Sequence, residues 1–312
     1  MQINESEAVE DLQTIGDFLR WTMSCLEQSQ VYLGHGTDNA WDEALALILP
    51  SLYLPLELDP QLLSSKLTHS ERQGLAAQVR RRVEDFIPTP YLTNKAWFGG
   101  LEFFVDERVL IPRSPFAEVL QDALPNWFGE DGPCSILELC TGSGCIAILA
   151  ALTYSEANVI ASDISTKALD VARINRSHYD LEESLQLIES DLFGTIADAH
   201  FDLIISNPPY VGADEMASIP KEYQHEPVLA LASGQDGLDI VSRILVEADG
   251  YLTENGLLVV EVGNSDEALQ ARYPEVPFLW LDFEHGGHGV FALTAKQLKQ
   301  YKSHFTHSVQ DS

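Results

Sequence analysis

The feature that most constrains the fold is a regular alternation of short apolar segments with helical segments, which begins near residue 136. The apolar segments are rich in the residue types of buried strands, and helical patterns separate most of them. They cover residues 136–139, 159–162, 185–189, 201–206, 257–262, 278–283 and 290–293. Since strands that alternate with helices form parallel sheets, this rhythm predicts an α/β fold with a parallel, doubly wound sheet.

The first part of the chain has the pattern of helices packed on helices. Apolar residues within residues 7–33 recur close to the 3.6-residue period of a helix. A second helix is expected over residues 41–49, with Asp38 as its cap and Pro50 as its end, and a third from about residue 70 to 86. The sequence therefore predicts a helical N-terminal domain.

Two features divide this domain from the sheet. Pro88-Thr89-Pro90 is typical of a linker, and residues 97–111 have the pattern of a β-hairpin. The basic run Arg80-Arg81-Arg82, near the end of the third helix, is interpreted as a solvated helix face. The predicted domains are a helical domain for substrate recognition at 1–90, a β-hairpin linker at 91–115 and a catalytic domain at 116–312.

The charge balance limits the partners. Asp and Glu number 48 and Lys and Arg 18, so the formal net charge is −30. Affinity for DNA and RNA depends on Lys and Arg, so we expect no direct DNA binding. Such a surface favours a basic partner, although it is also typical of hosts whose proteins are acidic in general.

Cysteine spacing and apolar runs exclude two further classes. The four cysteines form no C-x-x-C pair, so we expect no metal site. The longest plain apolar run, residues 145–152, is far shorter than the roughly 20 residues of a membrane span. The N-terminus lacks the pattern of a signal peptide, and we expect a cytoplasmic protein without a membrane partner.

A glycine-containing loop follows the first expected strand of the sheet. The segment 136–139 leads directly into Cys140-Thr141-Gly142-Ser143-Gly144, and a helix follows. In open α/β sheets, ligands bind beyond the carboxyl ends of the strands. The two glycines leave room for a nucleotide close to the backbone, and Thr141 and Ser143 supply hydroxyl groups.

Carboxylates follow the next two expected strands. Asp163 is placed to accept hydrogen bonds from ribose hydroxyls, and Asp191 from an adenine amino group, with Leu192 and Phe193 flanking the ring. The loop also matches the dinucleotide fingerprint, with an acid about 20 residues further on. By themselves these residues leave open a nicotinamide enzyme and a methyltransferase.

The fourth strand ends at Asn207-Pro208-Pro209-Tyr210, hereafter the NPPY motif. The prolines supply no N–H donors, so the carbonyls of Asn207 and Pro208 can project into a site. A planar –NH₂ group can donate one hydrogen to the Asn207 side-chain oxygen and the other to the Pro208 carbonyl, while Tyr210 lies against its face. These acceptors stabilise positive charge that develops on a weakly nucleophilic nitrogen as it takes a methyl group from a sulfonium.

The NPPY motif after the fourth strand, together with the loop 138–144, resembles the amino methyltransferases that act on planar nitrogens, including adenine-N6 DNA methyltransferases and protein glutamine methyltransferases. The resemblance implies a class I fold, a Rossmann-like sheet of seven strands, and S-adenosyl-L-methionine as cofactor. It also implies that Asn207, Pro208 and Tyr210 are catalytic and that Pro209 joins them in binding substrate. The implied cofactor residues are Glu138, Cys140, Thr141, Gly142, Ser143, Gly144, Asp163, Asp191, Leu192 and Asn207.

Flanking segments resemble the glutamine branch of this family. They are Phe98-Gly99-Gly100, Val109-Leu110-Ile111-Pro112-Arg113 and the stretch from Glu226 to Leu238. Release-factor methylases usually continue Ile-Pro-Arg with proline and an acid, whereas this chain continues with Ser114-Pro115-Phe116. That form, and the segment 34–44, is similar to the subgroup that methylates a glutamine of the third large-subunit ribosomal protein. Methylation of release factors is the alternative, followed by adenine methylation of DNA. Cys140 departs from the family, which usually has glycine there.

Five other features have weaker interpretations. His35 is expected to position the N-terminal domain or touch a partner, and Tyr223 and His225 to line a substrate channel. Arg113 has two open roles, as a contact to substrate or cofactor or as one side of a structural ion pair. The segment 285–289 is interpreted as a glycine-rich connection between strands and not as a metal or phosphate loop.

Overall fold

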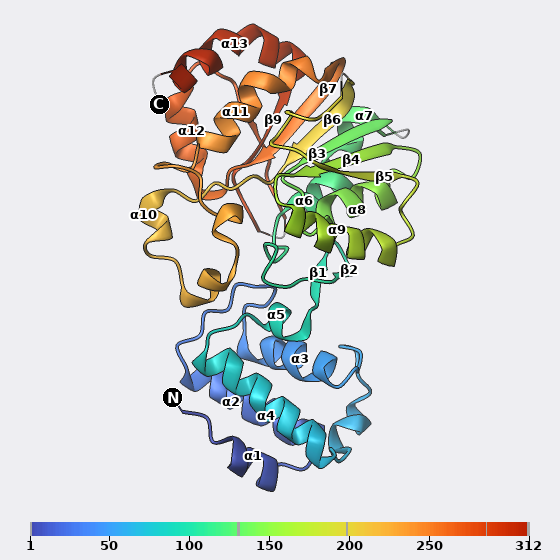
Figure 1. Cartoon of the computed structure of the whole chain (residues 1–312), viewed down its shortest axis with the longest axis vertical. Helices are drawn as coiled ribbons and strands as arrows, with labels where there is room; N and C mark the ends of the chain where they lie inside the picture. Colours follow the sequence, from blue (N-terminus) through green and yellow to red (C-terminus); the bar gives the residue numbers. More distant parts are fainter. Residues whose placement is uncertain (1, 130–131, 198, 285, 311–312) are drawn as a thin grey trace.

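The N-terminal part of the protein is a compact group of helices (Figure 1). The computed structural model describes residues 2–129, 132–197, 199–284 and 286–310. The helices are α1 (Glu5–Asp11), α2 (Ile15–Gln28), α3 (Ala40–Ser51), the 3-10 helix η1 (Pro60–Ser64), α4 (His69–Glu84) and α5 (Thr89–Thr93). Their buried faces share one core, in which Phe18, Leu47 and Val79 have no exposed surface.

Capping residues explain where these helices begin. Thr14 and Asp17 form a capping box, so the expected helix over residues 7–33 is wrong: α1 and α2 are separate. The cap of α3 is Asn39, whose side chain accepts from the Asp42 backbone, and not Asp38. α3 also continues past Pro50 to its end at Ser51.

Two expectations for the region after α3 are also wrong. Arg82 is 1% exposed and not solvated, because it forms ion pairs with Glu43 and Glu222. The Pro88-Thr89-Pro90 segment is more than a linker, since α5 begins within it. The expected hairpin is confirmed: β1 (Ala96–Phe98) pairs with β2 (Leu101–Phe103) through a turn at Gly99-Gly100, where φ is positive at both glycines.

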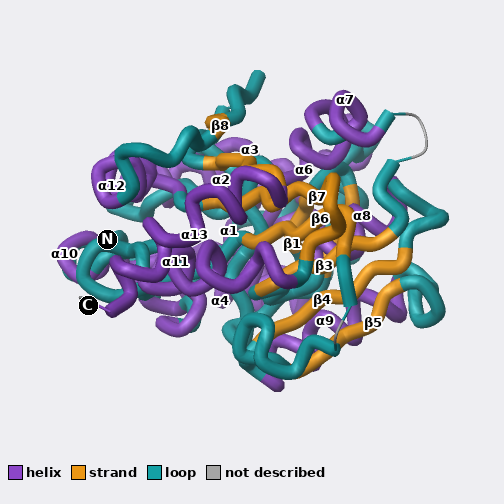
Figure 2. Tube along the Cα trace, turned by 90° about the horizontal axis from the view of Figure 1, so that it is seen from above, coloured by secondary structure: helices purple, strands orange, loops and turns teal. Residues whose placement is uncertain are grey.

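The second part of the chain forms one mixed sheet, which has seven strands within the described residues (Figures 1 and 2). The strands are β3 (Ser135–Leu139), β4 (Asn158–Asp163), β5 (Leu185–Glu189), β6 (Phe201–Ser206), β7 (Leu252–Glu261), β8 (Leu279–Trp280) and β9 (Val290–Thr294). Their order is β5-β4-β3-β6-β7-β9-β8. All expected strands are present, but β9 runs antiparallel to both of its neighbours, so the expectation of a purely parallel sheet is wrong.

Helices cover both faces of this sheet (Figure 1). The helices of this part of the chain are α6 (Phe116–Glu118), the π-helix η2 (Val119–Ala123), α7 (Pro125–Phe128), α8 (Cys145–Thr153), α9 (Thr166–His178), α10 (Ala213–Met216), α11 (Asp239–Glu247), α12 (Asp266–Arg272) and α13 (Ala295–Gln310), with the 3-10 turns η3 (Lys221–His225), η4 (Val228–Ala230), η5 (Ala248–Gly250) and η6 (Gly263–Ser265). Of these, α10 has no buried residue and lies away from the sheet (Figure 1). Successive side chains of a strand point to opposite faces. In β6, Leu203 and Ile205 therefore pack with the α8 side, and Ile204 with the α11 side. Both faces being buried explains the continuous apolar runs of the strands.

Candidate active site

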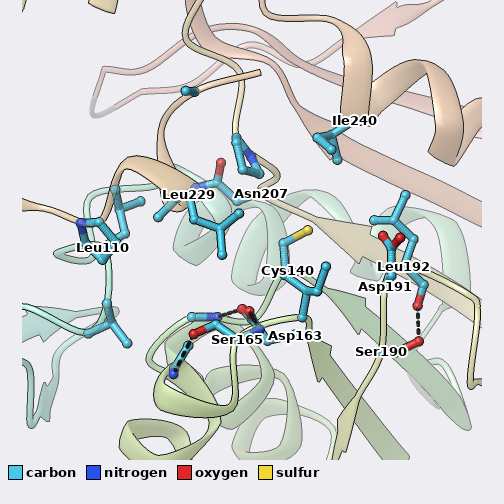
Figure 3. A pocket seen from close by; sticks show the side chains of 18 of the residues that line it. Leu110, Cys140, Asp163, Ser165, Ser190, Asp191, Leu192, Asn207, Leu229 and Ile240 are labelled. Carbon is cyan, nitrogen blue, oxygen red and sulfur yellow. Dashed lines mark hydrogen bonds between the residues drawn. The ribbon is translucent and has the colours of Figure 1, made fainter. Parts of the chain in front are cut away.

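A pocket lies beyond the carboxyl ends of the parallel strands, which is where open α/β sheets bind ligands. We call it the strand-end pocket. Figure 3 shows Cys140, Asp163, Asp191 and Asn207, each at or just after the end of a different strand, around the same cavity. Its lining includes six predicted site residues beside Pro209: Cys140, Gly142, Asp163, Asp191, Leu192 and Asn207.

The loop after β3 brings the backbone to the edge of the strand-end pocket. Gly142 has φ +56° and a Cβ there would meet no atom within 4 Å, so this part of the loop is open to a ligand. Cys140 adopts φ +60°, a left-handed conformation that glycine takes without strain. The Cys140 side chain lines the strand-end pocket.

The two predicted carboxylates of the strand-end pocket are held differently. Asp163 accepts hydrogen bonds from the backbone N–H groups of Gly142 at 2.9 Å and Ser165 at 2.8 Å. Burial raises the pKa of Asp163 in spite of these bonds. Asp191 is more exposed, and its Oδ1 accepts from Arg243 at 2.9 Å. Both carboxylates keep part of their acceptor capacity for a ligand.

Four predicted cofactor residues do not line the strand-end pocket: Glu138 of β3, and Thr141, Ser143 and Gly144 of the loop itself. Glu138 is buried and accepts from the Thr141 hydroxyl and, at 3.0 Å, from the Ala147 backbone. Burial raises the pKa of Glu138 to about 8. The carboxyl therefore ties the loop to the start of α8. Phe193 is also misassigned, since it is buried and stacks on Tyr251.

Sequence reasoning missed several residues around the strand-end pocket. The missed lining residues are Arg108, Val109, Leu110, Ile164, Ser165, Ala168, Ser190, Pro227, Leu229, Ala230, Ala232, Ile240 and Arg243. Ile164 carried a usable signal, because it directly follows the strand-ending Asp163. Leu229 is 58% exposed, which is unusual for an apolar side chain and marks the rim of the pocket.

A second pocket lies on the other side of the NPPY motif. We call it the tyrosine pocket, since Tyr32, Tyr210 and Tyr223 line it. Its other lining residues are Leu110, Arg113, Asn207, Pro208, Val211, Glu215, Ile219, Pro220, Ala230, Leu231 and Asn264. The motif separates the two pockets: Pro209 lines the strand-end pocket, Pro208 and Tyr210 line the tyrosine pocket, and Asn207 lines both.

Tyr210 is held at its hydroxyl and along its ring. Its hydroxyl donates to Glu261 Oε1 at 2.9 Å, and Ser114 donates to the other carboxylate oxygen at 2.5 Å. A Cβ at Gly263 would come within 2.6 Å of the Tyr210 ring. Burial and the nearby Glu261 carboxylate raise the pKa of Tyr210 well above its usual value. The ring is therefore a neutral wall of the pocket, and Ser114 supports it through the shared Glu261 carboxylate.

Of the two roles that the sequence left open for Arg113, the structural ion pair is observed, and the contact to substrate or cofactor stays a prediction. Arg113 lines the tyrosine pocket, and its guanidinium makes paired contacts of 2.6 and 2.9 Å with the Glu226 carboxylate. Its charge also lies 4.9 Å from the centre of the Tyr223 ring. Burial alone would raise the pKa of Glu226, but the His35 ring and Arg113 lower it to about 2.

The histidines have mostly structural surroundings. His35 is buried, its ring lies 4.5 Å from that of Tyr223, and its Nε2 is 3.8 Å from Glu226, too far for a hydrogen bond. His225 bonds to the Asp85 carbonyl and lines neither pocket, whereas Tyr223 lines the tyrosine pocket, so a role in a substrate channel stays a prediction for Tyr223 alone. In the glycine-rich connection, His288 contacts Asn264, and His285 lies outside the described residues.

Two kinds of feature are absent from the described residues. No group of His, Cys, Asp or Glu side chains among them could hold a metal ion. In the same part of the chain, no helix has the length and apolar content needed to cross a membrane.

Known proteins resemble this chain at two levels. A family model described as "Methyltransferase small domain" matches residues 117–226. Among solved structures, the hMettl16 catalytic domain in complex with the MAT2A 3'UTR hairpin 6 superposes with a TM-score of 0.51 at 16% identity, covering 89% of this chain and 90% of that chain. This likeness confirms the class I methyltransferase fold.

Curated relatives match at much higher identity. The "Ribosomal protein uL3 glutamine methyltransferase" of Francisella tularensis is 44% identical over 305 residues, which is 97% of each chain. The protein of the same name from Neisseria gonorrhoeae is 47% identical over 294 residues, 94% of this chain and 98% of the relative. The protein is thus a methyltransferase that uses S-adenosyl-L-methionine, and it belongs to the family of ribosomal protein uL3 glutamine methyltransferases.

Proposed function

We propose that this enzyme methylates the side-chain amide nitrogen of a glutamine in ribosomal protein uL3. The observation that carries the proposal is the position of Asn207, which lines both the strand-end pocket and the tyrosine pocket. Methyl transfer requires the methyl donor and the acceptor nitrogen to be held close together and in line, so their binding sites must adjoin. Asn207 lies where the two pockets adjoin, at the end of β6.

The strand-end pocket suits the methyl donor. Asp163 and Asp191 offer carboxylate oxygens for ribose hydroxyls and an adenine amino group, and Leu192 offers an apolar face for the ring. The open space at Gly142 lets the amino acid part of the donor approach the backbone. Glu138 and Thr141 act from behind by fixing the loop. When bound, S-adenosyl-L-methionine supplies a methyl group on a positively charged sulfur.

The NPPY motif suits a primary amide as the acceptor. The Asn207 side-chain oxygen and the Pro208 carbonyl accept the two hydrogens of the –NH₂ group, and Tyr210 packs on its plane. Both acceptors stabilise the positive charge that grows on nitrogen as the new N–C bond forms and the S–C bond breaks. The nitrogen then loses one proton to water, so no strong base is needed in the tyrosine pocket.

The substrate assignment rests on the named relatives and on charge. The relatives act, by their names, on ribosomal protein uL3. A net charge of −30 favours encounter with a basic protein and disfavours DNA. We assign residues 1–90 to substrate recognition, 91–115 to a linker and 116–312 to catalysis. We place the enzyme in the cytoplasm.

A direct test supplies labelled methyl donor to the purified enzyme together with uL3 or a peptide chain release factor. We expect label on uL3, with much less on the release factor, and an adenine-containing DNA duplex serves as the third acceptor. Label on the release factor alone, or on DNA alone, would overturn the substrate assignment while leaving the methyltransferase assignment intact.

A further inference from the structure

We infer that Arg82 is a positioning residue for the protein acceptor, because it holds Tyr32 as a wall of the tyrosine pocket. The inference rests on the proposed function, in that the tyrosine pocket is where the acceptor binds. It assigns a substrate-binding role to a buried ion cluster within the helical N-terminal part.

The cluster joins three separate segments of the chain. The Arg82 side chain, on α4, is 1% exposed. Its Nε donates to Glu43 Oε1 of α3 at 2.6 Å, and its Nη1 donates to Glu222 Oε1 of η3 at 3.1 Å. Glu43 also accepts from the Thr89 hydroxyl at 2.7 Å. Since η3 belongs to the segment that follows the NPPY motif, this arginine connects the N-terminal helices to the acceptor side of the catalytic part.

The same cluster fixes the backbone of Tyr32 on both sides. The Tyr32 N–H donates to Glu222 Oε1 at 2.8 Å, and its carbonyl accepts from Arg82 Nη2 at 2.8 Å. Its ring remains 46% exposed, lines the tyrosine pocket and lies 5.7 Å from the Tyr223 ring. The loop between α2 and α3 thus supplies one wall of the tyrosine pocket. The Arg82 guanidinium positions this wall, because its three nitrogens bond to Glu43, Glu222 and the Tyr32 carbonyl.

The geometry is more specific than stability alone requires. Compared with apolar packing, a buried arginine between two carboxylates contributes little net stability, because desolvation offsets the attraction. The cost of desolvation is recovered only when every N–H donor of the arginine is hydrogen-bonded. Here the third donor direction is directed to the carbonyl of a pocket residue. Lysine could keep the charge, but its single ammonium cannot reproduce the fixed fork of a guanidinium.

The effect of Arg82 is expected to be confined to the acceptor. Neither Tyr32 nor Arg82 lines the strand-end pocket. A change at Arg82 that leaves the protein folded should therefore alter the KM for uL3 and leave the affinity for S-adenosyl-L-methionine unchanged. General destabilisation would affect both.

The test compares the full-length R82K, Y32A and R82K/Y32A enzymes with wild type on purified uL3. The matched control is R80K, since Arg80 lies on the same helix but makes exposed ion pairs with Glu5 and Asp85. We expect R82K and Y32A each to raise the KM for uL3 about tenfold, the effect of losing one charge-assisted hydrogen bond or one aromatic contact. The kcat, the donor Kd and the control should stay at wild-type values.

The double variant separates action through Tyr32 from any other role. If Arg82 acts by placing the Tyr32 ring, removing the ring makes the arginine irrelevant, so R82K/Y32A should match Y32A. A folded R82K enzyme with wild-type KM, or additive effects in the double variant, would overturn the inference. If R82K does not fold, Y32A decides, and a wild-type KM in Y32A would overturn it. Failure of wild type to methylate uL3 would instead remove the proposed function.

Discussion

The strand-end pocket and the tyrosine pocket share Asn207 but are built in different ways. The strand-end pocket comes mostly from loops that follow consecutive strands of one sheet. The tyrosine pocket combines the α2–α3 loop, the segment after the hairpin and the segment after the NPPY motif. Its parts are held by ion pairs between residues far apart in sequence, 140 for Arg82 and Glu222 and 113 for Arg113 and Glu226.

The difference shows how one enzyme can keep its cofactor chemistry while its acceptor site changes. Repeated strand-end loops bind a nucleotide through backbone groups and carboxylates that the sheet itself places. The tyrosine pocket, which we propose as the acceptor site, depends on how separate segments are joined, so we expect substitutions at the joining residues to change substrate use and to leave donor binding unchanged. Four predictions test this separation.

The largest expected effect is at Asn207, the residue of the NPPY motif that lines both pockets. Asn207→Ala removes the acceptor for one amide hydrogen and should lower kcat by roughly 10²–10³. Donor binding, measured by calorimetry, should be largely kept. Asn264→Ala removes an amide that lines only the tyrosine pocket and should have a smaller effect on kcat. Equal losses in the two variants would show that Asn207 has no special place between the pockets.

A second prediction concerns the ion pair that closes the tyrosine pocket. Arg113→Met leaves the buried Glu226 carboxylate without its cation and should lower the free energy of unfolding by about 3 kcal/mol. Arg173→Met serves as the control, since Arg173 and Asp170 are about half exposed and the pair should contribute less than about 1 kcal/mol. Urea unfolding of both variants checks this. Similar losses would contradict a special role of the buried pair.

The third prediction is that Glu226, beside the tyrosine pocket, and Glu138, beside the loop after β3, contribute to the pH dependence of stability with opposite signs. Glu226 has a pKa of about 2, below the ordinary 4.5, so its contribution is present above pH 4.5 and lost as the pH falls towards 2. Glu138 has a pKa of about 8, so its contribution is complete below pH 4.5 and lost as the pH rises to about 8.

Unfolding free energies measured across this pH range in Glu226→Gln and Glu138→Gln test the assignment. Glu226→Gln should reduce the loss of unfolding free energy that occurs as the pH falls below 4.5. Glu138→Gln should reduce the loss of unfolding free energy that occurs as the pH rises from 4.5 to 8. A Glu138→Gln enzyme with the wild-type slope in that range would mean that Glu138 titrates normally.

The smallest expected effect lies in the loop after β3. Cys140→Gly removes a left-handed strain of about 1 kcal/mol, partly offset by the greater backbone entropy of glycine in the unfolded chain, so it should be mildly stabilising. Cys145→Gly, at the start of α8, should instead destabilise by about 1 kcal/mol or more. Thermal unfolding of both variants measures the difference. A destabilised C140G enzyme would show that the cysteine side chain packs usefully in the strand-end pocket.

The same contrast explains what the sequence could predict. The strands, the loop after β3 and the NPPY motif were all expected, because each is a local pattern: an apolar run, a glycine turn or a diproline end. The direction of β9 was not predictable, since the apolar period of a strand does not depend on the direction of its neighbour.

The tyrosine pocket was only partly expected, because its contacts are not local. Arg82 stands in a run of three arginines, and nothing in that run shows that one of them faces Glu43 and Glu222 in the core. Tyr32 likewise has no flanking motif, although the adjacent segment 34–44 carries the resemblance to the uL3 subgroup. Arg113 and Ser114 were singled out by resemblance. In the structure they hold the carboxylates of Glu226 and Glu261, which explains what these two side chains do in the tyrosine pocket.

The most direct test of the central claim is tandem mass spectrometry of uL3 after incubation with the enzyme and S-adenosyl-L-methionine carrying a deuterated methyl group. The account predicts one labelled methyl group on the side-chain nitrogen of a glutamine, present with wild type and strongly reduced with Asn207→Ala. A label on lysine, arginine or a backbone nitrogen, or equal glutamine labelling by Asn207→Ala, would contradict the role assigned to Asn207 between the two pockets.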